Sequence, residues 1–330
     1  MADKQRIQFI DLAKGVCILL VILGHCGVNL HLTMLRDVRM PLYFILSGLF
    51  FKDYGGWLNF ALRNTNKILV PFVFFYLVSY ALFYAIGPLW PQYIVAGKAQ
   101  GITDLWHSRA CFNGPLWFLI CLFWTNLIFC AVSRYIRWQW LQPIVVIALA
   151  AVGLYIGERH ILLPLMIDAS LSALPYFYLG YLLKRTPILY PTRFARLCIP
   201  VAAVLLVGAW WLADAFSNPY IDLHYNRAVG SLWVAVTVAV MGVGGILMLC
   251  KAIGHIPWGS YIGRYSIIAL CTHHIVYRPL IILIPNTWVV AAITLAIVTA
   301  LIPLCIKYIP QFTAQTDLFP LKLRKRSSNG

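Results

Sequence analysis

The sequence predicts an all-α polytopic membrane protein, a bundle of about ten transmembrane helices. Hydrophobic residues make up 62% of the 330 residues and charged residues only 11%, whereas soluble domains carry about 25% charged residues. Mean hydropathy is +0.81, and apolar runs long enough to cross a bilayer recur along the chain. The polar side chains are too few to cover a water-soluble surface, so we expect the lipid bilayer to surround the protein.

Ten apolar segments are candidate spans, of which the second and the fifth are short. In chain order they are Phe9–Leu30, Met40–Phe51, Ile68–Ile86, Pro115–Ser133, Pro143–Gly157, Ala169–Leu183, Ile199–Phe216, Ala228–Leu249, Ser266–Ile284 and Trp288–Ile306.

The distribution of basic residues predicts how these spans are oriented. A formal net charge of +16 would suit a nucleic-acid binder, but the Lys and Arg residues gather in alternate loops, so we expect no nucleic-acid partner. The positive-inside rule predicts that both termini are cytoplasmic, with a single transmembrane domain over 1–306 and a basic cytoplasmic tail over 307–330. The predicted outer segments hold only Arg36, Arg39, Lys98, Arg109, Arg159, Arg227 and Arg278. We expect Arg278 to anchor its helix at the outer headgroups.

The first span, "IDLAKGVCILLVILGH", carries three ionisable side chains in an apolar setting. A helix advances about 100° and 1.5 Å per residue, so Lys14 and His25 lie on one face, about 16 Å apart along the axis. Asp11 lies one turn before Lys14, within about 60° of the same direction. The three groups therefore form one polar stripe, with Lys14 towards the cytoplasm and His25 towards the outside.

A charged group in the bilayer centre costs about 2.5–3.5 kcal/mol on insertion scales, so this stripe is expected to face the bundle interior or a wet cavity. Two interpretations are open. Asp11 and Lys14 could form a structural pair near the inner interface, with His25 satisfied by a hydrogen bond. Alternatively, the stripe is a polar path that ends at an imidazole suited to proton exchange near neutral pH.

A basic residue, ten intervening positions and a histidine in the first span resemble the signature of the integral-membrane acyltransferase-three family. Four further stretches are similar to the family's pattern and occur in its order: "MPLYFILSGLFFK", "LRNTNKILVPF", "GPLWFLICLF" and "IGRYSIIALCTHH". The family includes sugar O-acetylases, and the chain resembles fucose 4-O-acetylase. It departs from the pattern at Lys14, where the family often has arginine.

The resemblance implies an O-acetyltransferase in the cytoplasmic (inner) membrane of a bacterium, with multiple spans. Acetyl-coenzyme A, or another short acyl-coenzyme A, would donate from the cytoplasmic side to a hydroxyl of a glycan or lipid-linked saccharide. His25 would remove the hydroxyl proton, Lys14 would contribute charge, and Asp11 would orient or neutralise Lys14. An acyl-histidine relay is a second variant. No metal is expected, and the sequence does not indicate the oligomeric state.

The expected donor site lies at the cytoplasmic side. Arg63 and Lys67 are four residues apart on what reads as an interfacial helix, so they lie near one face and would hold the phosphates of coenzyme A together with Lys14. Ser47 and Trp117 complete the predicted donor site, Trp117 as a wall of the acyl pocket. Attraction to lipid headgroups, close helix packing at Ser47-Gly48 and an interfacial aromatic belt remain alternative interpretations.

The expected acceptor site combines polar and aromatic residues of the outer loops and the late spans. Ser266 and His273 are seven residues apart and share a helix face, whereas His274 points about 100° away. The predicted acceptor-binding residues are Asn113, Tyr225, Arg227, Ser266, His273 and His274.

A membrane transporter or flippase is the alternative function, with the stripe of Asp11, Lys14 and His25 as a solute or proton path. Ten helices with buried ionisable groups would suit that class equally well. However, the sequence shows neither the inverted symmetry nor the paired broken helices of many transporters.

Overall fold

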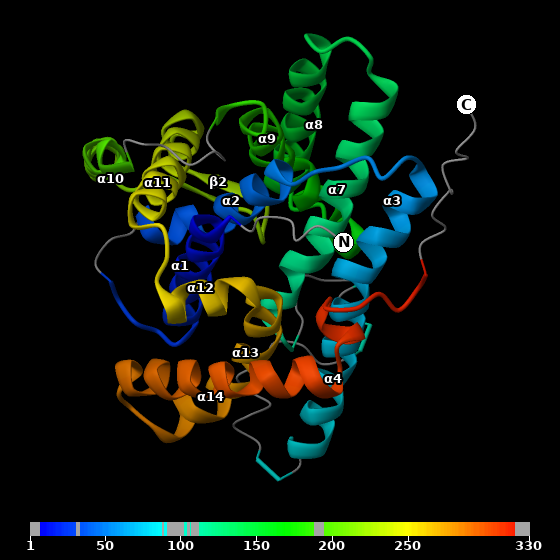
Figure 1. Ribbon diagram of the computed structural model, residues 1–330, viewed down its shortest axis with the longest axis vertical. Coiled ribbons are helices and arrows are strands. Elements are labelled where there is room, and N and C mark those ends of the chain that lie inside the picture. The colour runs from blue at the N-terminus through cyan, green and yellow to red at the C-terminus, as the bar shows by residue number, and fades with distance from the viewer. Residues whose placement is uncertain are drawn as a thin grey trace, which may run out of the picture.

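The computed structural model describes residues 7–30, 34–87, 89–90, 102–103, 106, 112–187 and 195–320, and helices make up most of this part of the chain (Figure 1). The long helices are α1 (Gln8–His25), α2 (Met34–Leu49), α4 (Val70–Ile86), α7 (Trp117–Tyr135), α8 (Leu141–Glu158), α9 (Ile167–Leu183), α10 (Cys198–Ala215), α11 (Leu232–Ile253), α13 (Ser266–Leu283) and α14 (Thr287–Tyr308). The predicted all-α membrane fold is confirmed.

Short elements connect these helices. They are α3 (Trp57–Asn64), the π-helical turn η1 (Thr65–Leu69), η2 (Gly114–Leu116), η3 (Pro164–Met166), η5 (Ala195–Leu197), α12 (Pro257–Arg264) and η6 (Gln311–Thr313). Strands β1 (Tyr220–Asp222) and β2 (Arg227–Val229) form an antiparallel hairpin in which Tyr220 pairs with Val229.

Eight helical segments of the described chain are long and apolar enough to cross a membrane. They are Gln8–His25, Trp57–Ile86, Gly114–Tyr135, Leu141–Glu158, Ala195–Ala215, Leu232–Ile253, Ser266–Leu283 and Thr287–Tyr308. Helices α2 and α9 have 16 and 17 residues and fall below the 18 residues of that criterion. Each predicted span thus corresponds to a helix, while ten crossings stay a prediction.

Several predicted boundaries differ from the structure, and the first helix ends at His25 rather than at Leu30. Helix α2 begins at Met34 rather than at Met40, so the charged residues before the apolar stretch belong to the helix. The third span is not preceded by a separate interfacial helix, because one helical run continues from Trp57 to Ile86 through η1. The eighth span begins at Leu232, since Ala228 lies in β2.

Glycines let several helices approach closely. A Cβ atom on Gly48 of α2 would overlap the carbonyl oxygen of Phe177 in α9, and one on Gly180 would overlap the carbonyl oxygen of Ile45. In the same way, Gly15 of α1 faces the backbone of α12. Small residues at such crossings are typical of membrane helices. The packing interpretation of Ser47-Gly48 is therefore confirmed for Gly48.

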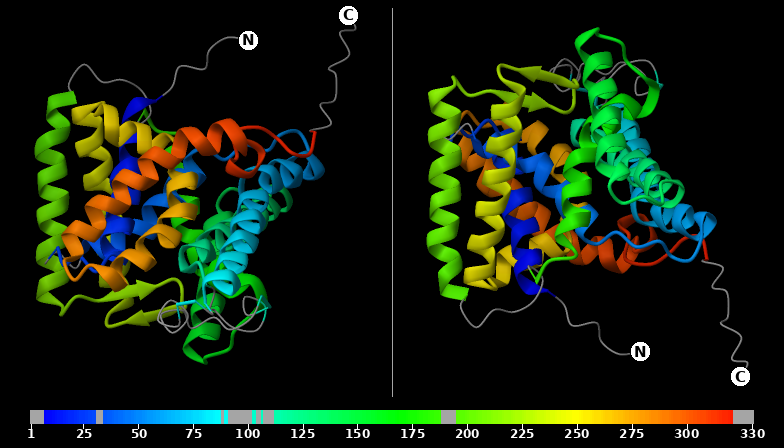
Figure 2. Two further views of the ribbon diagram at one scale, coloured as in Figure 1. Left: turned by 90° about the horizontal axis from the view of Figure 1, so that it is seen from below. Right: turned by 90° about the horizontal axis from the view of Figure 1, so that it is seen from above.

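Different secondary-structure elements lie at the two ends of the helix bundle. The β1–β2 hairpin lies at one end, and the start of α1, helix α3 and the segment after α14 lie at the other (Figure 2). This arrangement agrees with the predicted topology, in which the hairpin is outside and both ends of the chain are cytoplasmic. Helix α10 lies at the edge of the bundle beside α11 and exposes Val204 and Trp211, as a lipid-facing helix would.

Candidate active site

Helix α1 carries the predicted polar stripe without interruption. It runs unbroken from Gln8 to His25, so Lys14 and His25 keep the spacing of about 16 Å that the helical rise predicts. The Lys14 ammonium lies 5.5 Å from the centre of the Phe50 ring, and the Tyr43 hydroxyl donates to the Lys14 carbonyl oxygen over 3.4 Å. Asp11 and Lys14 are half-buried, whereas His25 at the far end is exposed.

His25 lies against three aromatic side chains of α13. Its ring centroid is 5.4 Å from that of His273, 6.0 Å from that of His274 and 6.0 Å from that of Tyr277. His273 is fully buried and His274 is 6% exposed, so the two rings lie behind the accessible His25. The structure therefore brings together three of the predicted site residues and adds Tyr277, which the sequence did not single out.

The hydrogen bond of His273 assigns its tautomer. Its Nδ1 lies 2.9 Å from the carbonyl oxygen of Ala269, and a carbonyl oxygen only accepts, so Nδ1 carries the hydrogen. In the neutral ring Nε2 is then an acceptor. Within the described part of the chain, this buried Nε2 has no hydrogen-bond partner. A buried acceptor of this kind is available to a hydroxyl or an N–H group that enters the site.

Asn113 connects two helices beside this cluster. Its side-chain amide donates to the Cys271 carbonyl oxygen over 2.9 Å and to the Ser79 hydroxyl over 3.0 Å. The next residue, Gly114, faces His274, because a Cβ atom there would lie 3.5 Å from the His274 Nε2. The Asn113 amide thus links α13 to α4 and helps to hold His273 and His274 in place.

A cavity of about 310 Å³ opens beside His25. It is lined by Val21, Gly24, His25, Arg36, Asp37, Arg39, Met40, Pro41, Trp117, Tyr220, Ile221, Asp222, Leu223 and His224. The ring centroids of Trp117 and His224 are 5.1 Å apart, so the two side chains form a continuous wall. The volume of this cavity lies at the lower end of the range of about 300–1,000 Å³ typical of small-molecule sites.

Charged residues at the start of α2 also line the cavity, although the sequence pattern did not mark them as site residues. Arg36 donates from Nε to Asp37 Oδ1 over 3.2 Å, and its guanidinium lies 3.9 Å from the centre of the Tyr220 ring. The Asp37 side chain is only 6% exposed, and its Oδ2 has no hydrogen-bond partner in the described chain. Arg39 bonds the carbonyl oxygens of Arg36 and Leu20. Asp37 therefore presents an unused acceptor at the cavity.

The hairpin supplies the opposite side of the cavity. Asp222 Oδ1 accepts hydrogen bonds of 3.0 Å from the backbone N–H groups of His224 and Tyr225, which fixes the turn between the strands. Asp222 and His224 line the cavity, whereas Tyr225 and Arg227 are exposed and do not line it. Of the polar residues in this stretch, the structure thus favours Asp222 and His224 over the predicted pair.

The remaining predicted residues lie elsewhere in the bundle. Ser47 is half-buried in α2 beside Gly48, and Ser266 begins α13 and is buried. Trp117, predicted for the acyl pocket, lines the cavity beside His25. Arg278 contradicts the prediction of a headgroup anchor, because it is 8% exposed and lies 5.4 Å from the centre of the Phe112 ring.

The two cations of the predicted donor site converge at the end of the bundle opposite the hairpin. Arg63 Nη1 lies 3.3 Å and Lys67 Nζ 3.0 Å from the two carboxylate oxygens of Asp317. Arg63 lies in the last turn of α3 and Lys67 in the π-helical turn η1, a feature that often occurs at functional sites. Both side chains are partly exposed, as access for a charged ligand requires.

No group of three or more His, Cys, Asp and Glu side chains among the described residues could hold a metal ion.

Comparison with known proteins relates the chain to one described family. A family model described as an acyltransferase domain, that of the acyltransferase-three family, matches residues 7–308. Neither the curated proteins nor the solved structures contain a match. The matched range includes the histidine cluster, the cavity and the Arg63–Lys67 pair.

Proposed function

Because the chain belongs to the acyltransferase-three family of membrane acyltransferases, we propose that it is an O-acyltransferase with a saccharide acceptor. The proposed donor is acetyl-coenzyme A or another short acyl-coenzyme A. The proposed acceptor is a hydroxyl of a glycan or lipid-linked sugar, and the proposed location is the inner membrane of a bacterium.

The observation that carries this proposal is the position of His25. Its imidazole is accessible at a cavity of about 310 Å³, and His273 lies directly behind it. A general base has to reach the proton that it removes and has to be held in one orientation. The two rings supply both requirements from helices α1 and α13.

The lining of the cavity suits a sugar. Trp117, Tyr220 and His224 offer aromatic faces to the apolar face of a pyranose, while Asp37 and Asp222 offer carboxylate oxygens to its hydroxyls. Hydrogen bonds to a charged acceptor contribute about 1.5–3 kcal/mol each. The unused Oδ2 of Asp37 is the strongest candidate for such a bond.

The proposed reaction is a direct transfer. A ring nitrogen of His25 takes the proton of the acceptor hydroxyl as the hydroxyl oxygen attacks the thioester carbonyl carbon. The C–S bond then breaks, and the leaving thiolate takes the proton back from the imidazolium. The His273 Nε2 accepts a hydrogen bond from His25 or from the acceptor hydroxyl and so holds the reacting groups in line. An acyl-histidine intermediate is the less economical route, since it adds a second transfer.

The donor is proposed to bind along α1. Arg63 and Lys67 would hold its phosphates, because Lys and Arg are the side chains that bind phosphate most strongly, and Lys14 would carry charge further into the bundle. Trp117 would then contact the acyl group beside His25. The separation of about 16 Å between Lys14 and His25 means that they serve different parts of one long ligand. Asp11 is proposed to orient Lys14.

A transport function is less well supported. The family match covers residues 7–308 and therefore includes the whole stripe of Asp11, Lys14 and His25. A transporter needs two compartments, whereas a transferase needs only its two substrates. This difference separates the two functions experimentally.

The test uses the full chain purified in detergent, without a sealed membrane. Acetyl-coenzyme A labelled in the acetyl group is supplied with a broad panel of glycans and lipid-linked saccharides. The proposal predicts labelled acceptor and free coenzyme A in equal amounts. If no donor is consumed across the panel, but substrate crosses the bilayer in proteoliposomes, the transport function is correct and the proposal is wrong.

A further inference from the structure

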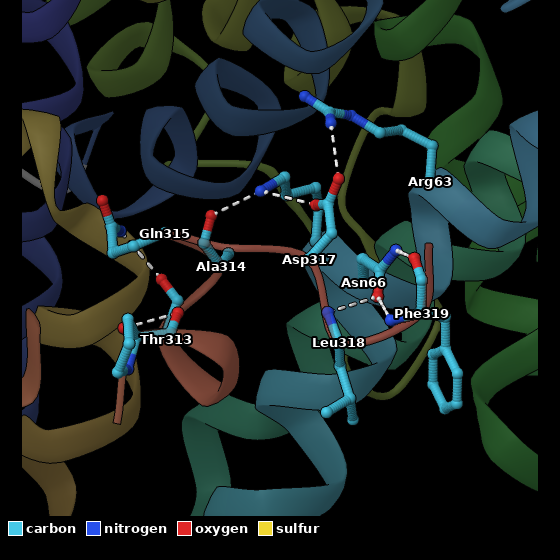
Figure 3. Close-up of polar contacts among 10 residues, drawn as sticks. Arg63, Asn66, Thr313, Ala314, Gln315, Asp317, Leu318 and Phe319 are labelled. Carbon is cyan, nitrogen blue, oxygen red and sulfur yellow. Dashed lines mark hydrogen bonds and ion pairs between the residues drawn. The ribbon is translucent and has the colours of Figure 1, made fainter. Parts of the chain in front are cut away.

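The segment after α14 returns to the Arg63–Lys67 pair. Asp317 bridges the two cations, with one carboxylate oxygen on Arg63 Nη1 and the other on Lys67 Nζ (Figure 3). The Lys67 ammonium also donates to the carbonyl oxygen of Ala314 over 2.8 Å. The two side chains proposed for the donor phosphates are thus occupied by an anionic group of the same chain.

We call residues 311–319 the C-terminal strap, and Asn66 holds its end. The Asn66 amide donates to the Phe319 carbonyl oxygen over 2.8 Å, and its side-chain oxygen accepts from the backbone N–H groups of Leu318 and Phe319 (Figure 3). Asn66 itself is fully buried in the π-helical turn. All three of these bonds from the Asn66 side chain go to backbone atoms of the strap.

An aromatic contact fixes the start of the strap. The rings of Phe312 in η6 and Phe74 in α4 stack with centroids 4.3 Å apart and planes within 17°. The strap is thus anchored at both ends by contacts that carry no net charge, and Asp317 lies between the anchors. Removal of the Asp317 charge should leave the strap folded in place.

The ion pairs of Asp317 are partly exposed to solvent and therefore weak enough for a more highly charged anion to displace. The side chains of Arg63, Lys67 and Asp317 are 35%, 26% and 27% exposed, and ion pairs in contact with water contribute little to stability. In the described part of the chain, Arg63 contacts Asp317 through Nη1 alone, which leaves its other N–H groups for a two-bond contact with a phosphate. A phosphate group carries more charge than a carboxylate and offers three acceptor oxygens.

We propose that the C-terminal strap is an internal ligand of the donor site, in which Asp317 occupies the position of a coenzyme A phosphate. This inference rests on the proposed function. A donor has to displace Asp317 before it binds, so the strap disfavours acyl donors that lack phosphates. It thereby acts as a determinant of donor specificity and lowers the affinity of the site for coenzyme A.

The experiment measures equilibrium binding of coenzyme A, which has no acyl group and cannot react, to the full chain in detergent. In Asp317→Asn the competing charge is lost while Asn66 and Phe312 still anchor the strap. We expect the dissociation constant of coenzyme A to fall about three- to tenfold, since each exposed ion pair contributes up to about a fivefold effect. Pantetheine, which has no phosphate, should show no such gain.

The matched control is Asp53→Asn. Asp53 pairs with Arg134 over 2.8 Å and is also partly exposed, so this variant removes the same charge from an ion pair without contact to Arg63 or Lys67. Its affinity for coenzyme A should equal that of the wild type. A gain of the same size in both variants would mean that overall charge is responsible, and the inference would be wrong.

Hydrogen exchange of the strap gives a second, independent readout. The amides of Leu318 and Phe319 are bonded to Asn66 in the free protein, and we expect coenzyme A to accelerate their exchange. Two results together would contradict the inference about the strap: coenzyme A does not change the exchange of these amides, and Asp317→Asn binds coenzyme A with the wild-type dissociation constant. The proposed donor site would be unaffected by that outcome. If neither protein binds coenzyme A at millimolar concentration, the proposed donor is wrong and the inference falls with it.

Discussion

The imidazole rings of His25 and His273 lie with their centroids 5.4 Å apart and their planes tilted by 47°. They come from the first and the second-last long helices of the described chain. One ring is accessible at the cavity, and the other is fully buried with its Nδ1 bonded to Ala269. In the proposed reaction, this contact joins the general base to the group that orients it.

The His273→Ala variant tests this positioning role. Loss of the Nε2 acceptor should lower kcat about 10- to 100-fold, by analogy with the loss of an orienting partner from a metal-bound histidine, with KM for both substrates nearly unchanged. Steady-state kinetics with labelled donor would measure kcat and KM separately. The control is Thr272→Ala, since the Thr272 hydroxyl donates to the Ile268 carbonyl oxygen of its own helix. A kcat equal to that of the wild type would show that His25 needs no support from His273.

Asp37→Asn tests the acceptor side of the cavity. The substitution keeps the shape of the side chain but replaces one carboxylate oxygen by an amide group, so a sugar hydroxyl loses its charged acceptor. We expect KM for the acceptor to rise about tenfold or more, as the loss of one charge-assisted hydrogen bond implies, with KM for acetyl-coenzyme A unchanged. Equal effects on both substrates would indicate a folding role for Asp37.

Lys67→Gln tests the donor side. Loss of one phosphate-binding charge should raise KM for acetyl-coenzyme A several-fold and leave KM for the acceptor unchanged. The wild-type KM for the donor should also rise with salt, because partly exposed charges are screened, and this salt dependence should be weaker in the variant. A donor KM that is independent of both Lys67 and salt would contradict the assignment of this site.

Gly48→Ala tests the crossing of α2 and α9. The added Cβ atom would overlap the Phe177 carbonyl oxygen, and the backbone cannot yield as a flexible side chain does. We expect a loss of about 1–3 kcal/mol in stability, measured as a lower thermal midpoint in detergent. Gly244→Ala is the control, because its Cβ atom would meet only the end of the Leu205 side chain. An equal midpoint for Gly48→Ala would mean that the crossing is looser than described.

Composition and apolar runs sufficed to predict the helices, because a membrane-spanning helix is specified by its own residues. The stripe from Lys14 to His25 was equally predictable, since it depends on one helix. The approach of His25 to His273 was not, because helical periodicity does not reveal which helices are neighbours. Both residues were named as site candidates for separate reasons.

The charged start of α2 shows a second limit. Arg36 and Asp37 precede the apolar stretch, so they read as loop residues, whereas α2 begins at Met34 and carries them into the cavity wall. Arg278 shows the same limit in reverse. Its position near the end of a span suggests a headgroup anchor, but the neighbouring Phe112 covers it. Burial of a charge depends on tertiary contacts that the sequence pattern does not contain.

The strap was not predictable for a similar reason. The sequence beyond Ile306 reads as a basic tail, yet α14 continues to Tyr308 and the residues up to Phe319 pack on η1. Residues 321–330 of the predicted tail lie outside the described part of the chain. A single Asp in a basic stretch becomes informative only once Arg63 and Lys67 are seen beside it.

The most direct test of the central claim is acyl transfer by His25→Ala and His25→Gln, measured with acetyl-labelled coenzyme A in purified full-length protein. Loss of the general base should lower kcat about 10²- to 10⁴-fold in both variants, while coenzyme A still binds at the Arg63–Lys67 pair. His255→Ala, which changes an exposed histidine between α11 and α12, should retain wild-type transfer. Transfer at the wild-type rate in His25→Ala would contradict the account, because the proposed reaction assigns removal of the hydroxyl proton to His25.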